Sequence, residues 1–553
     1  MGIYVNPPAD GFEAILKRNS YIDKSELIAY TNYVLGTDRM LTCSTRPRRF
    51  GKSFAVKMLT AYYSKGADAR SIFENLRIAR LDGKTEQGED IFFEKYMNKQ
   101  DVISLDMTPF VALAAKPSEI VSDMQKAVIE ELREEYPDCI QEGTENLYKA
   151  LIRIHQKTGR KFFIIIDEWD MVFRESKDDK DVQKEYINLL RSLFKSNQTS
   201  QILVGGYMTG ILPIKKYGSQ SALTDFREFT MLKPGVLAPF IGFTEAEVAD
   251  LCKKYDLDFD ETRKWYDGYR FDGVGHIYCP NSIMELVITR NFDSYWTETE
   301  TYESLRDYID LNLDGLRDGI VDMLGGQSCR IDIGTFQNDL TSISGRDDIF
   351  TLLVHLGYLA YDFKKKEVFI PNEEVRGEFI RAIRGGRRAE LARAVRISDK
   401  LLNATIQMDE ELVAELIGTV HMEEITLQNY NNEQALRYVV LMAYLSCMDH
   451  YLRFEELAGG RGFSDILFLP RKNSSKPALL IELKWNKSAD KAIGQIHEKQ
   501  YNEVLKKFDY TGELLLVGIN YSEKTGKHTC KIERFRGTNR TKVTEREMGC
   551  LKE

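Results

Sequence analysis

A chain of 553 residues is too long for a single hydrophobic core, so roughly two to four domains are expected. Its hydrophobic content of 43% and charged content of 29% are typical of globular proteins, and its net charge of -9 is not the basic balance usual in dedicated nucleic-acid binders. No apolar run approaches the roughly 20 residues of a membrane-spanning helix, and the N-terminus lacks the apolar core of a signal peptide. We therefore expect a cytoplasmic protein without a membrane partner.

The absence of several short motifs argues against a zinc protein, a disulfide-bonded protein and a serine hydrolase. The eight cysteines contain no Cys-x-x-Cys pair, which argues against a zinc site and against a disulfide framework. The seven histidines contain no His-Glu-x-x-His pair, and the chain has no Gly-x-Ser-x-Gly segment typical of serine hydrolases. The motifs that remain as candidates for a catalytic or binding site are phosphate-binding and carboxylate motifs.

A Gly-Lys-Ser triplet lies between a predicted strand and a predicted helix. Apolar residues at 40–43 predict the strand, and the pattern of residues 53–64 predicts a helix whose N-terminal amides would face a bound phosphate. Gly51 lets the backbone approach phosphate, Lys52 offers a compact positive charge, and Ser53 offers a hydroxyl to Mg²⁺. The triplet therefore predicts an ATP-binding loop.

The loop departs from the usual phosphate-loop pattern, because Arg46 stands in place of its first glycine. Read alone, it is also compatible with an ordinary basic loop. A second motif favours the nucleotide interpretation: the apolar run 162–166 predicts a buried parallel strand that ends in Asp167 and Glu168. There Asp167 would hold Mg²⁺ through water, and Glu168 would act as general base on the attacking water. The alternative is an acidic turn after a buried strand.

Strand-like and helical segments alternate from residue 20 to about residue 215, which predicts an α/β domain with a parallel sheet covered by helices on both faces. Thr209 follows the last of these strands, where a polar side chain would sense the γ-phosphate, although a hydroxyl that merely ends a strand is the commoner case. Strands are predicted at 102–105, 162–166 and 202–208, and helices at 120–136, 147–156 and 182–195.

Four domains are predicted along the chain. Residues 1–234 form the ATP-binding domain, and the mostly helical, aromatic-rich residues 235–334 form a lid. In residues 335–388, a helix at 349–356 followed by a short hairpin suits a winged helix. The charged segment 384–388 marks the boundary before a last domain at 389–553.

A β-hairpin with charged residues at defined positions is predicted in that last domain. Glu482 and Lys484 lie two residues apart on a strand, so their side chains point to the same face, and Asp465 begins the neighbouring strand. Asp465 and Glu482 would bind Mg²⁺, while Lys484 would stabilise the hydroxide and the charge that develops on a phosphodiester. A hairpin with a solvated charged face is the alternative.

Three further features surround this hairpin. Glu433 lies on a helix with an apolar stripe and could supply another carboxylate, and a helix that begins at residue 489 carries Gln495 and Tyr501. The basic stretch 524–546 would either contact a phosphate backbone or form a solvated surface.

With these motifs, nearly the whole chain resembles the bacterial AAA-ATPase-like proteins that are fused to a C-terminal PD-(D/E)XK nuclease-superfamily domain. The resemblance rests on segments 21–25 (YIDKS), 46–53 (RPRRFGKS), 166–168 (IDE), 209–213 (TGILP), 265–269 (WYDGY), 357–359 (GYL), 462–465 (GFSD) and 481–484 (IELK). It implies an AAA-like or STAND-like phosphate-loop fold and a restriction-endonuclease-like fold, and it makes Arg46 an expected feature of the loop.

The resemblance also implies roles for particular residues. The ATP and Mg²⁺ site would comprise Arg46, Arg49, Gly51, Lys52, Ser53, Asp167 and Thr209, with Glu168 as catalytic base. The nuclease site would comprise Glu433, Asp465, Glu482 and Lys484, supported by Gln495 and Tyr501, with Asp465 and Glu482 on the metal.

Our hypothesis is that the ATPase regulates or positions a Mg²⁺-dependent nuclease that cleaves nucleic acid, DNA or RNA. The alternatives are an NTP-switched interaction protein whose nuclease-like domain only binds nucleic acid or protein, and an ATPase sensor that assembles into homo-oligomers. Arg227 and Arg270 are candidate arginine fingers, and the oligomeric state stays open.

Overall fold

The fold is described from a computed structural model. It describes residues 2–17, 21–81, 93–214, 216–217, 220–221, 223–271, 273–296, 305–306, 308–309, 315–337, 343–385, 389–424, 433–459, 462–470, 474, 476–498, 510 and 512–536. The chain divides into two compact units, Met1–Trp296 with Ser328–Glu374, and Thr297–Gln327 with Val375–Glu553. No helix within these described ranges is long and apolar enough to cross a membrane.

Five parallel strands form the N-terminal sheet, in the order β2-β3-β4-β1-β7. The predicted parallel sheet is therefore confirmed. The register places Asp106 beside Asp167 and Thr45 beside Gly210, so the ends of these strands lie along one edge of the sheet. The strands are β1 (Leu41–Thr45), β2 (Asp101–Asp106), β3 (Phe162–Asp167), β4 (Leu203–Gly210) and β7 (Arg227–Phe229).

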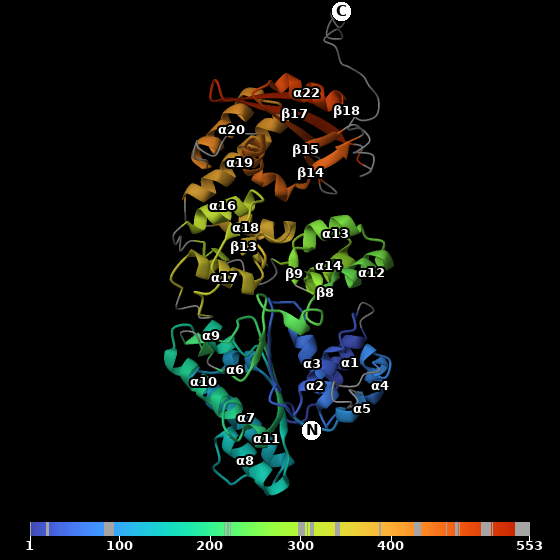
Figure 1. The fold of residues 1–553 in the computed structure, drawn as a ribbon, viewed down its shortest axis with the longest axis vertical. Helices are drawn as coiled ribbons and strands as arrows, with labels where there is room; N and C mark the ends of the chain where they lie inside the picture. Colours follow the sequence, from blue (N-terminus) through green and yellow to red (C-terminus); the bar gives the residue numbers. More distant parts are fainter. Residues whose placement is uncertain are drawn as a thin grey trace, which may run out of the picture. The chain divides into compact units, whose positions relative to one another are not determined.

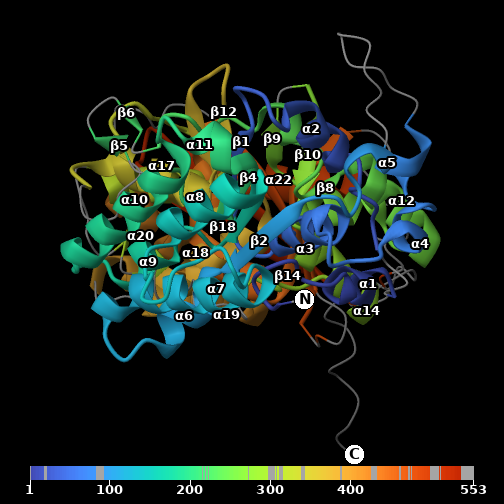
Figure 2. The same cartoon turned by 90° about the horizontal axis from the view of Figure 1, so that it is seen from below.

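Helices cover both faces of this sheet: Figure 1 shows α3 and α7 on opposite sides of it, and Figure 2 shows the same helices and β2 from below. Side chains of β3 alternate between the two faces, with Phe163 in the core beneath α1–α3 and Ile164 in the core beneath α7, α8 and α10. The main helices are α1 (Asp10–Leu16), α2 (Leu27–Val34), α3 (Lys52–Tyr63), α6 (Met107–Leu113), α7 (Ile120–Glu135), α8 (Leu147–Thr158), α9 (Met171–Glu175) and α10 (Lys180–Phe194). Shorter helices are α4 (Arg70–Phe73), α5 (Phe93–Tyr96) and α11 (Thr199–Ile202), and a small hairpin joins β5 (Lys216–Tyr217) to β6 (Gln220–Ser221).

The region predicted as a helical lid also contains a three-stranded sheet, in the order β8-β10-β9. Sequence patterns did not predict these strands, because they are only 2, 4 and 3 residues long. The region comprises β8 (Phe243–Thr244), α12 (Glu245–Tyr255), α13 (Phe259–Tyr266), β9 (Tyr269–Phe271), β10 (Gly275–Tyr278) and α14 (Pro280–Thr289).

A helix and a hairpin follow at the positions predicted for the winged helix. The hairpin joins β12 to β13, and β11 pairs with the other side of β13. The division into four domains with a winged helix stays a prediction. The elements are β11 (Cys329–Arg330), α17 (Arg346–Leu356), β12 (Ala360–Asp362) and β13 (Glu367–Phe369).

The C-terminal unit is built on a mixed sheet in the order β14-β15-β16-β17-β18. β16 and β17 are parallel, and the other neighbouring strands are antiparallel. The strands are β14 (Tyr451–Gly459), β15 (Gly462–Pro470), β16 (Ala478–Trp485), β17 (Glu513–Ser522) and β18 (Lys527–Arg536). The helices are α16 (Leu316–Leu324), α18 (Glu373–Gly385), α19 (Ala389–Gln407), α20 (Glu410–Glu424), α21 (Glu433–Ala443) and α22 (Ala489–Glu498).

Helix α22 packs on one face of this sheet (Figure 1). Its Ile493 and Ile496 share a core with Leu480 of β16 and Leu516 of β17. Gly518 of β17 permits the close approach, because a Cβ atom there would lie 2.5 Å from the carbonyl oxygen of Ala489. Glu482 and Lys484 lie two and four positions after Leu480 on β16, so they share its face of the sheet and point toward α22.

Two histidines are buried together on the C-terminal unit. The ring of His421, on α20, lies 5.2 Å from that of His528, which lies 4.8 Å from the ring of Tyr521. Burial, with a contribution from His421, lowers the pKa of His528 to about 4, and burial lowers the pKa of His421 as well. The folded unit therefore favours the neutral imidazoles.

This pair predicts acid sensitivity of the C-terminal unit. His528 contributes its full stability above its unfolded pKa near 6.5, and loses it as the pH falls toward its folded pKa of about 4. The lowered pKa of His528 corresponds to a contribution of about 3 kcal/mol to the free energy of unfolding. Melting of the full chain between pH 7.5 and pH 4.5 should show a shallower acid decline of the C-terminal transition in His528→Phe, which keeps a ring against Tyr521. Equal declines in both proteins would contradict this assignment.

Candidate functional sites

The predicted ATP-binding loop leads from β1 directly into α3. Gly51 caps the helix with a φ of 91°, a left-handed conformation that favours glycine, while no atom lies within 4 Å of the position that its Cβ would take. Glycine is therefore required by backbone conformation and not by crowding. The free N–H groups of the first turn of α3 are those that bind phosphate in such loops.

Lys52 lies inside this loop and beside the candidate general base. Its side chain is only 4% exposed, and its Nζ donates a hydrogen bond to the carbonyl oxygen of Pro47 at 3.0 Å. The same Nζ lies 3.6 Å from Oε1 of Glu168. Two residues more than a hundred positions apart in sequence are thus brought together at the edge of the sheet.

Asp167 and Ser53 also meet at this edge. Burial, together with the charges of Glu168 and Asp106, raises the pKa of Asp167 to about 6, although a hydrogen bond from Ser53 and the charge of Lys52 act to lower it. A buried carboxylate beside a second acid and a hydroxyl gains stability from a cation, and Mg²⁺ prefers such oxygen ligands. Ser53 and Asp167 therefore fit a magnesium site.

Thr209 is buried at the end of β4. Its hydroxyl donates to the carbonyl oxygen of Ser44 at 2.8 Å, and its own carbonyl oxygen accepts a hydrogen bond from the backbone N–H of Trp169 at 3.0 Å. These contacts link β4 to β1 and to the turn after β3. The sensing role of Thr209 stays a prediction, and its observed contacts connect the strands.

Arg46 is fully buried at the end of β1. Its Nη1 donates to the carbonyl oxygens of Thr45 at 2.8 Å and Phe229 at 3.2 Å, and its guanidinium lies 5.0 Å from the ring centre of Phe271. Burial lowers its pKa to about 10. Arg49, by contrast, is exposed, and its Nη1 lies 3.4 Å from the carbonyl oxygen of Tyr295. The contacts of Arg46 favour anchoring of the loop, and nucleotide binding by either arginine stays a prediction.

Replacing Arg46 with methionine separates anchoring from nucleotide binding. Methionine keeps much of the side-chain volume and removes the hydrogen bonds to the two carbonyl groups. We expect the variant to lose about 1–3 kcal/mol of stability in urea unfolding and to bind fluorescent ATP within about threefold of the parent protein. A much weaker affinity at unchanged stability would instead identify Arg46 as a nucleotide ligand.

Two aromatic motifs from distant parts of the sequence pack over the loop. The ring of Tyr269 on β9 lies 5.5 Å from that of Phe50 in an edge-to-face arrangement, and its hydroxyl donates to the carbonyl oxygen of Gly357. A Cβ atom at Gly357 would lie 2.7 Å from the ring of Pro47. The segments around Tyr269 and Gly357 therefore hold the conformation of the loop.

The candidate nuclease residues lie on the face of β16 beneath α22. Glu482 and Lys484 are both buried, and Nζ of Lys484 lies 3.1 Å from Oε1 of Glu482. Lys484 also donates to the carbonyl oxygen of Leu483 at 2.8 Å, and the Gln495 amide on α22 donates to the Glu482 carboxylate. Glu482, Lys484 and Gln495 are therefore brought together, as expected for a site and not for a solvated hairpin face.

The structure describes the other candidate nuclease residues only in part. The register that pairs Ile466 with Ile481 puts Asp465 opposite Glu482 when continued by one residue. The side chain of Asp465 and the whole of Tyr501 lie outside the described residues. Glu433 is exposed at the first position of α21.

Among the side chains that the structure describes, no three His, Cys, Asp or Glu residues gather into a metal site. Mg²⁺ needs no such group, since it commonly binds through one or two carboxylates with water and substrate phosphates. Glu482, buried beside Lys484, fits a site of that kind.

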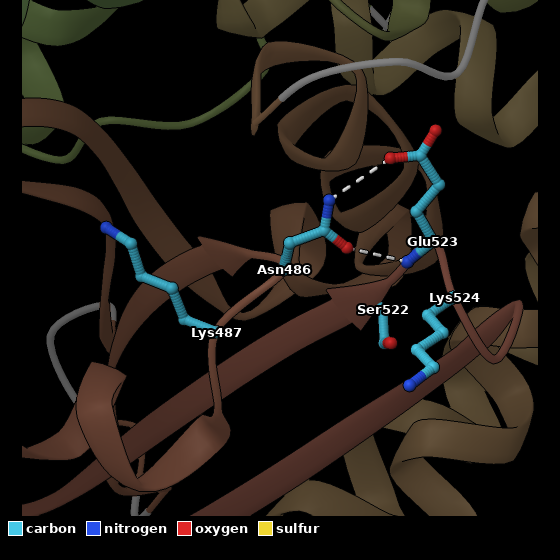
Figure 3. Close-up of a pocket in the computed structure, with 5 residues that line it drawn as sticks. All are labelled: Asn486, Lys487, Ser522, Glu523 and Lys524. Atoms are coloured by element: carbon cyan, nitrogen blue, oxygen red, sulfur yellow. Dashed lines mark hydrogen bonds between the residues drawn. The ribbon is translucent and has the colours of Figure 1, made fainter.

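A hollow of about 480 Å³ lies just beyond the end of β16 (Figure 3). Asn486 closes one side, donating to Oε2 of Glu523 at 3.1 Å and accepting from its backbone N–H at 2.8 Å. The side chains of Lys487 and Lys524 extend in different directions, so they do not form a single anion site. The hollow is lined by Asn486, Lys487, Ser522, Glu523 and Lys524.

Comparison with known proteins finds two family models that match separate parts of the chain. Residues 9–219 match the family model for a predicted AAA-ATPase, and residues 431–530 match the model for the PD-(D/E)XK nuclease superfamily. The chain therefore joins a region that matches a predicted AAA-ATPase to a region that matches the PD-(D/E)XK nuclease superfamily. The resemblance predicted from the motifs is thereby confirmed. The ATPase match includes Lys52 and Asp167, and the nuclease match includes Asp465, Glu482 and Lys484.

A relative from Azotobacter chroococcum mcd 1 is 26% identical over 175 residues. It is described as an uncharacterized protein in the vnfD 5' region. The match spans 31% of this chain and 33% of that protein, so the similarity covers only part of each.

Sequence reasoning missed four residues around the two sites. In the ATPase domain, Asp106 ends β2 as Asp167 ends β3, and Asp170 and Arg174 form an ion pair with a Nε to Oδ2 distance of 3.1 Å. Asp106 could have been found in the sequence as an acid at the end of a strand, and the pair of Asp170 and Arg174 by its spacing of four residues. In the nuclease-superfamily domain, buried Asn520 lies beside Lys484 and accepts a hydrogen bond from the N–H of Lys487 at 2.9 Å. Only the pairing of β16 with β17 could reveal it.

Proposed function

We propose that the N-terminal domain binds and hydrolyses ATP with Mg²⁺. The observation that carries this proposal is the convergence of Lys52, Ser53, Asp167 and Glu168 at one edge of the parallel sheet. When bound, Mg²⁺ would neutralise phosphate charge, and Ser53 and Asp167 are the residues that would hold it.

The roles of the other two residues follow from their positions. Lys52 would exchange its contact with the Pro47 carbonyl for the β- and γ-phosphates, which offer a charged partner in place of a neutral one. Glu168 is 21% exposed, so one side of its carboxylate can accept a proton from water. This division leaves Asp167 for the metal and Glu168 for the base.

The C-terminal domain is proposed to cleave phosphodiester bonds of nucleic acid, with DNA as the first substrate to test. Glu482 and Asp465 would hold a divalent cation that supplies charge stabilisation and an activated water. Lys484 lies against Glu482, where its positive charge would stabilise the pentacovalent phosphate, and Gln495 would orient the Glu482 carboxylate. Glu433 is proposed as a supporting acid.

We further propose that the nucleotide state of the ATPase regulates the nuclease. Purified protein incubated with supercoiled, linear and branched DNA, with and without ATP and Mg²⁺, tests both activities together. The expected result is Mg²⁺-dependent cleavage that changes when ATP is present. ATP hydrolysis without cleavage under any condition would leave the ATPase intact and reject the nuclease.

A binding module is the second candidate, because Lys484 and Gln495 both contact the Glu482 carboxylate and would compete with a metal ion for it. In this case the nuclease-like domain would hold nucleic acid without cutting it, and ATP would switch the interaction. Calorimetric titration of the full chain with Mg²⁺ or Mn²⁺, compared with a Glu482→Gln variant, separates the two. Loss of a metal-binding event in the variant supports the nuclease, and identical titrations support the binding module.

A further inference from the structure

Arg174, on α9, lies beside the candidate general base. Its side chain is only 9% exposed, and its Nη2 forms an ion pair with the Glu168 carboxylate. Its Nε lies 3.1 Å from Oδ2 of Asp170, and the same Nη2 lies 3.3 Å from the sulfur of Met171. One guanidinium thus bridges two carboxylates that lie on the turn between β3 and α9.

Asp170 connects Arg174 to the backbone that directly follows β4. It is completely buried and accepts hydrogen bonds from the backbone N–H groups of Ile211 at 3.2 Å and Leu212 at 2.8 Å. Burial acts to lower the pKa of Arg174, but the charges of Asp170 and Glu168 outweigh it and raise the pKa. The arginine is therefore held as a cation between two acids in a low-dielectric environment.

The backbone of Glu168 and two nearby cations together set the position of its side chain. Its backbone has a φ of 50°, a left-handed conformation that is uncommon for a residue other than glycine. Its N–H donates to Oδ1 of Asp167 at 3.0 Å, which ties the backbone to the neighbouring acid. The side chain has two cations nearby, Lys52 at 3.6 Å and Arg174 in direct contact.

Lys52 and Arg174 are expected to behave differently when nucleotide binds. Lys52 belongs to the phosphate-binding loop and is expected to turn to the phosphates. Arg174 is anchored by Asp170 to the turn after β4, so it has no comparable freedom to leave. Arg174 would then be the remaining cation that orients the Glu168 carboxylate.

We propose that Arg174 is a positioning residue that holds Glu168 in place for attack of water on ATP. The inference rests on the proposed ATPase function. Asp170 supports Arg174 from the turn after β4, so the contact pathway runs from Leu212 through Asp170 and Arg174 to Glu168.

The test measures steady-state ATP hydrolysis of the full chain. Arg174→Ala should lower kcat by about 10-fold to 100-fold, because misplacement of a catalytic group by about 1 Å has that order of effect. The KM for ATP and the affinity for fluorescent ATP should change less than about threefold, since Arg174 contacts the base and not the loop. Arg174→Lys, which keeps the charge, should recover part of the rate.

A double-mutant cycle separates positioning from a general structural effect. Once Glu168→Gln has removed the base, adding Arg174→Ala should slow the reaction no further, whereas a structural defect would multiply the two losses. Arg70→Ala is the matched control, because it removes an exposed ion pair with Glu94 and should leave hydrolysis unchanged.

The outcomes distinguish the inference from the function on which it rests. An inactive parent protein would reject the proposed ATPase itself. An active parent that loses activity in Lys52→Ala but keeps it in Arg174→Ala would reject only the positioning role. Multiplicative losses in the double variant would likewise overturn it.

Discussion

Replacement of Lys52 by alanine is expected to reduce ATP hydrolysis by about 100-fold to 1,000-fold. Loss of a single preorganised donor that stabilises transition-state charge in a water-poor site typically has this effect. Lys52 is 4% exposed, and within the described residues its polar contacts are the Pro47 carbonyl and Glu168, so its charge is available for phosphate. Hydrolysis is measured by phosphate release in the presence of Mg²⁺.

Lys57 provides the matched control for this substitution. It lies on the same helix, α3, but its side chain is exposed. Lys57→Ala should therefore hydrolyse ATP at the parent rate, with a melting temperature close to that of the parent. If Lys52→Ala and Lys57→Ala hydrolyse ATP equally well, the loop before α3 is not the catalytic phosphate-binding loop.

The second large effect is expected at Glu482. Glu482→Gln should reduce metal-dependent DNA cleavage by about 100-fold or more, because the uncharged amide is a poor ligand for Mg²⁺ and no longer balances Lys484. The change also removes one partner of a buried ion pair, which costs about 3–5 kcal/mol when the other charge remains. Cleavage of supercoiled plasmid and thermal melting are measured on the same preparation.

A double variant separates loss of chemistry from loss of stability. Glu482→Gln combined with Lys484→Met removes both buried charges, so most of the lost stability should return while cleavage stays absent. Glu498→Gln, at an exposed position of α22, is the control for a neutralised acid in the same domain and should cleave normally. Cleavage that returns with stability in the double variant would contradict the assignment of Glu482 and Lys484.

Most of the regular structure around both sites follows from local patterns. The unbroken apolar run of β3 predicted a strand covered on both faces, and the structure buries all of its residues from Phe162 to Asp167. The same reasoning placed Glu482 and Lys484 on one face of β16, where they form an ion pair. The strands β8, β9 and β10 escaped prediction because their two to four residues are too few to show a period.

Contacts that depend on the pairing of distant segments were not predictable in the same way. The i,i+4 spacing of Asp170 and Arg174 hinted at their ion pair, but nothing in the sequence connected Asp170 with the backbone of Leu212. Arg46 is similar: its place in the loop suggested a phosphate ligand, whereas its contact with Phe229 depends on how β1 pairs with β7.

The sequence by itself determined which chemical groups this protein carries, because Gly51, Lys52, Ser53, Asp167 and Glu482 are recognised by residue type and by their place after apolar strands. Only the tertiary structure decided which of these groups meet and what holds them. Side-chain periodicity reports one strand or helix at a time, whereas the contact of Glu168 with Arg174 and Lys52 requires the β3 turn, α9 and the β1 loop to fold together.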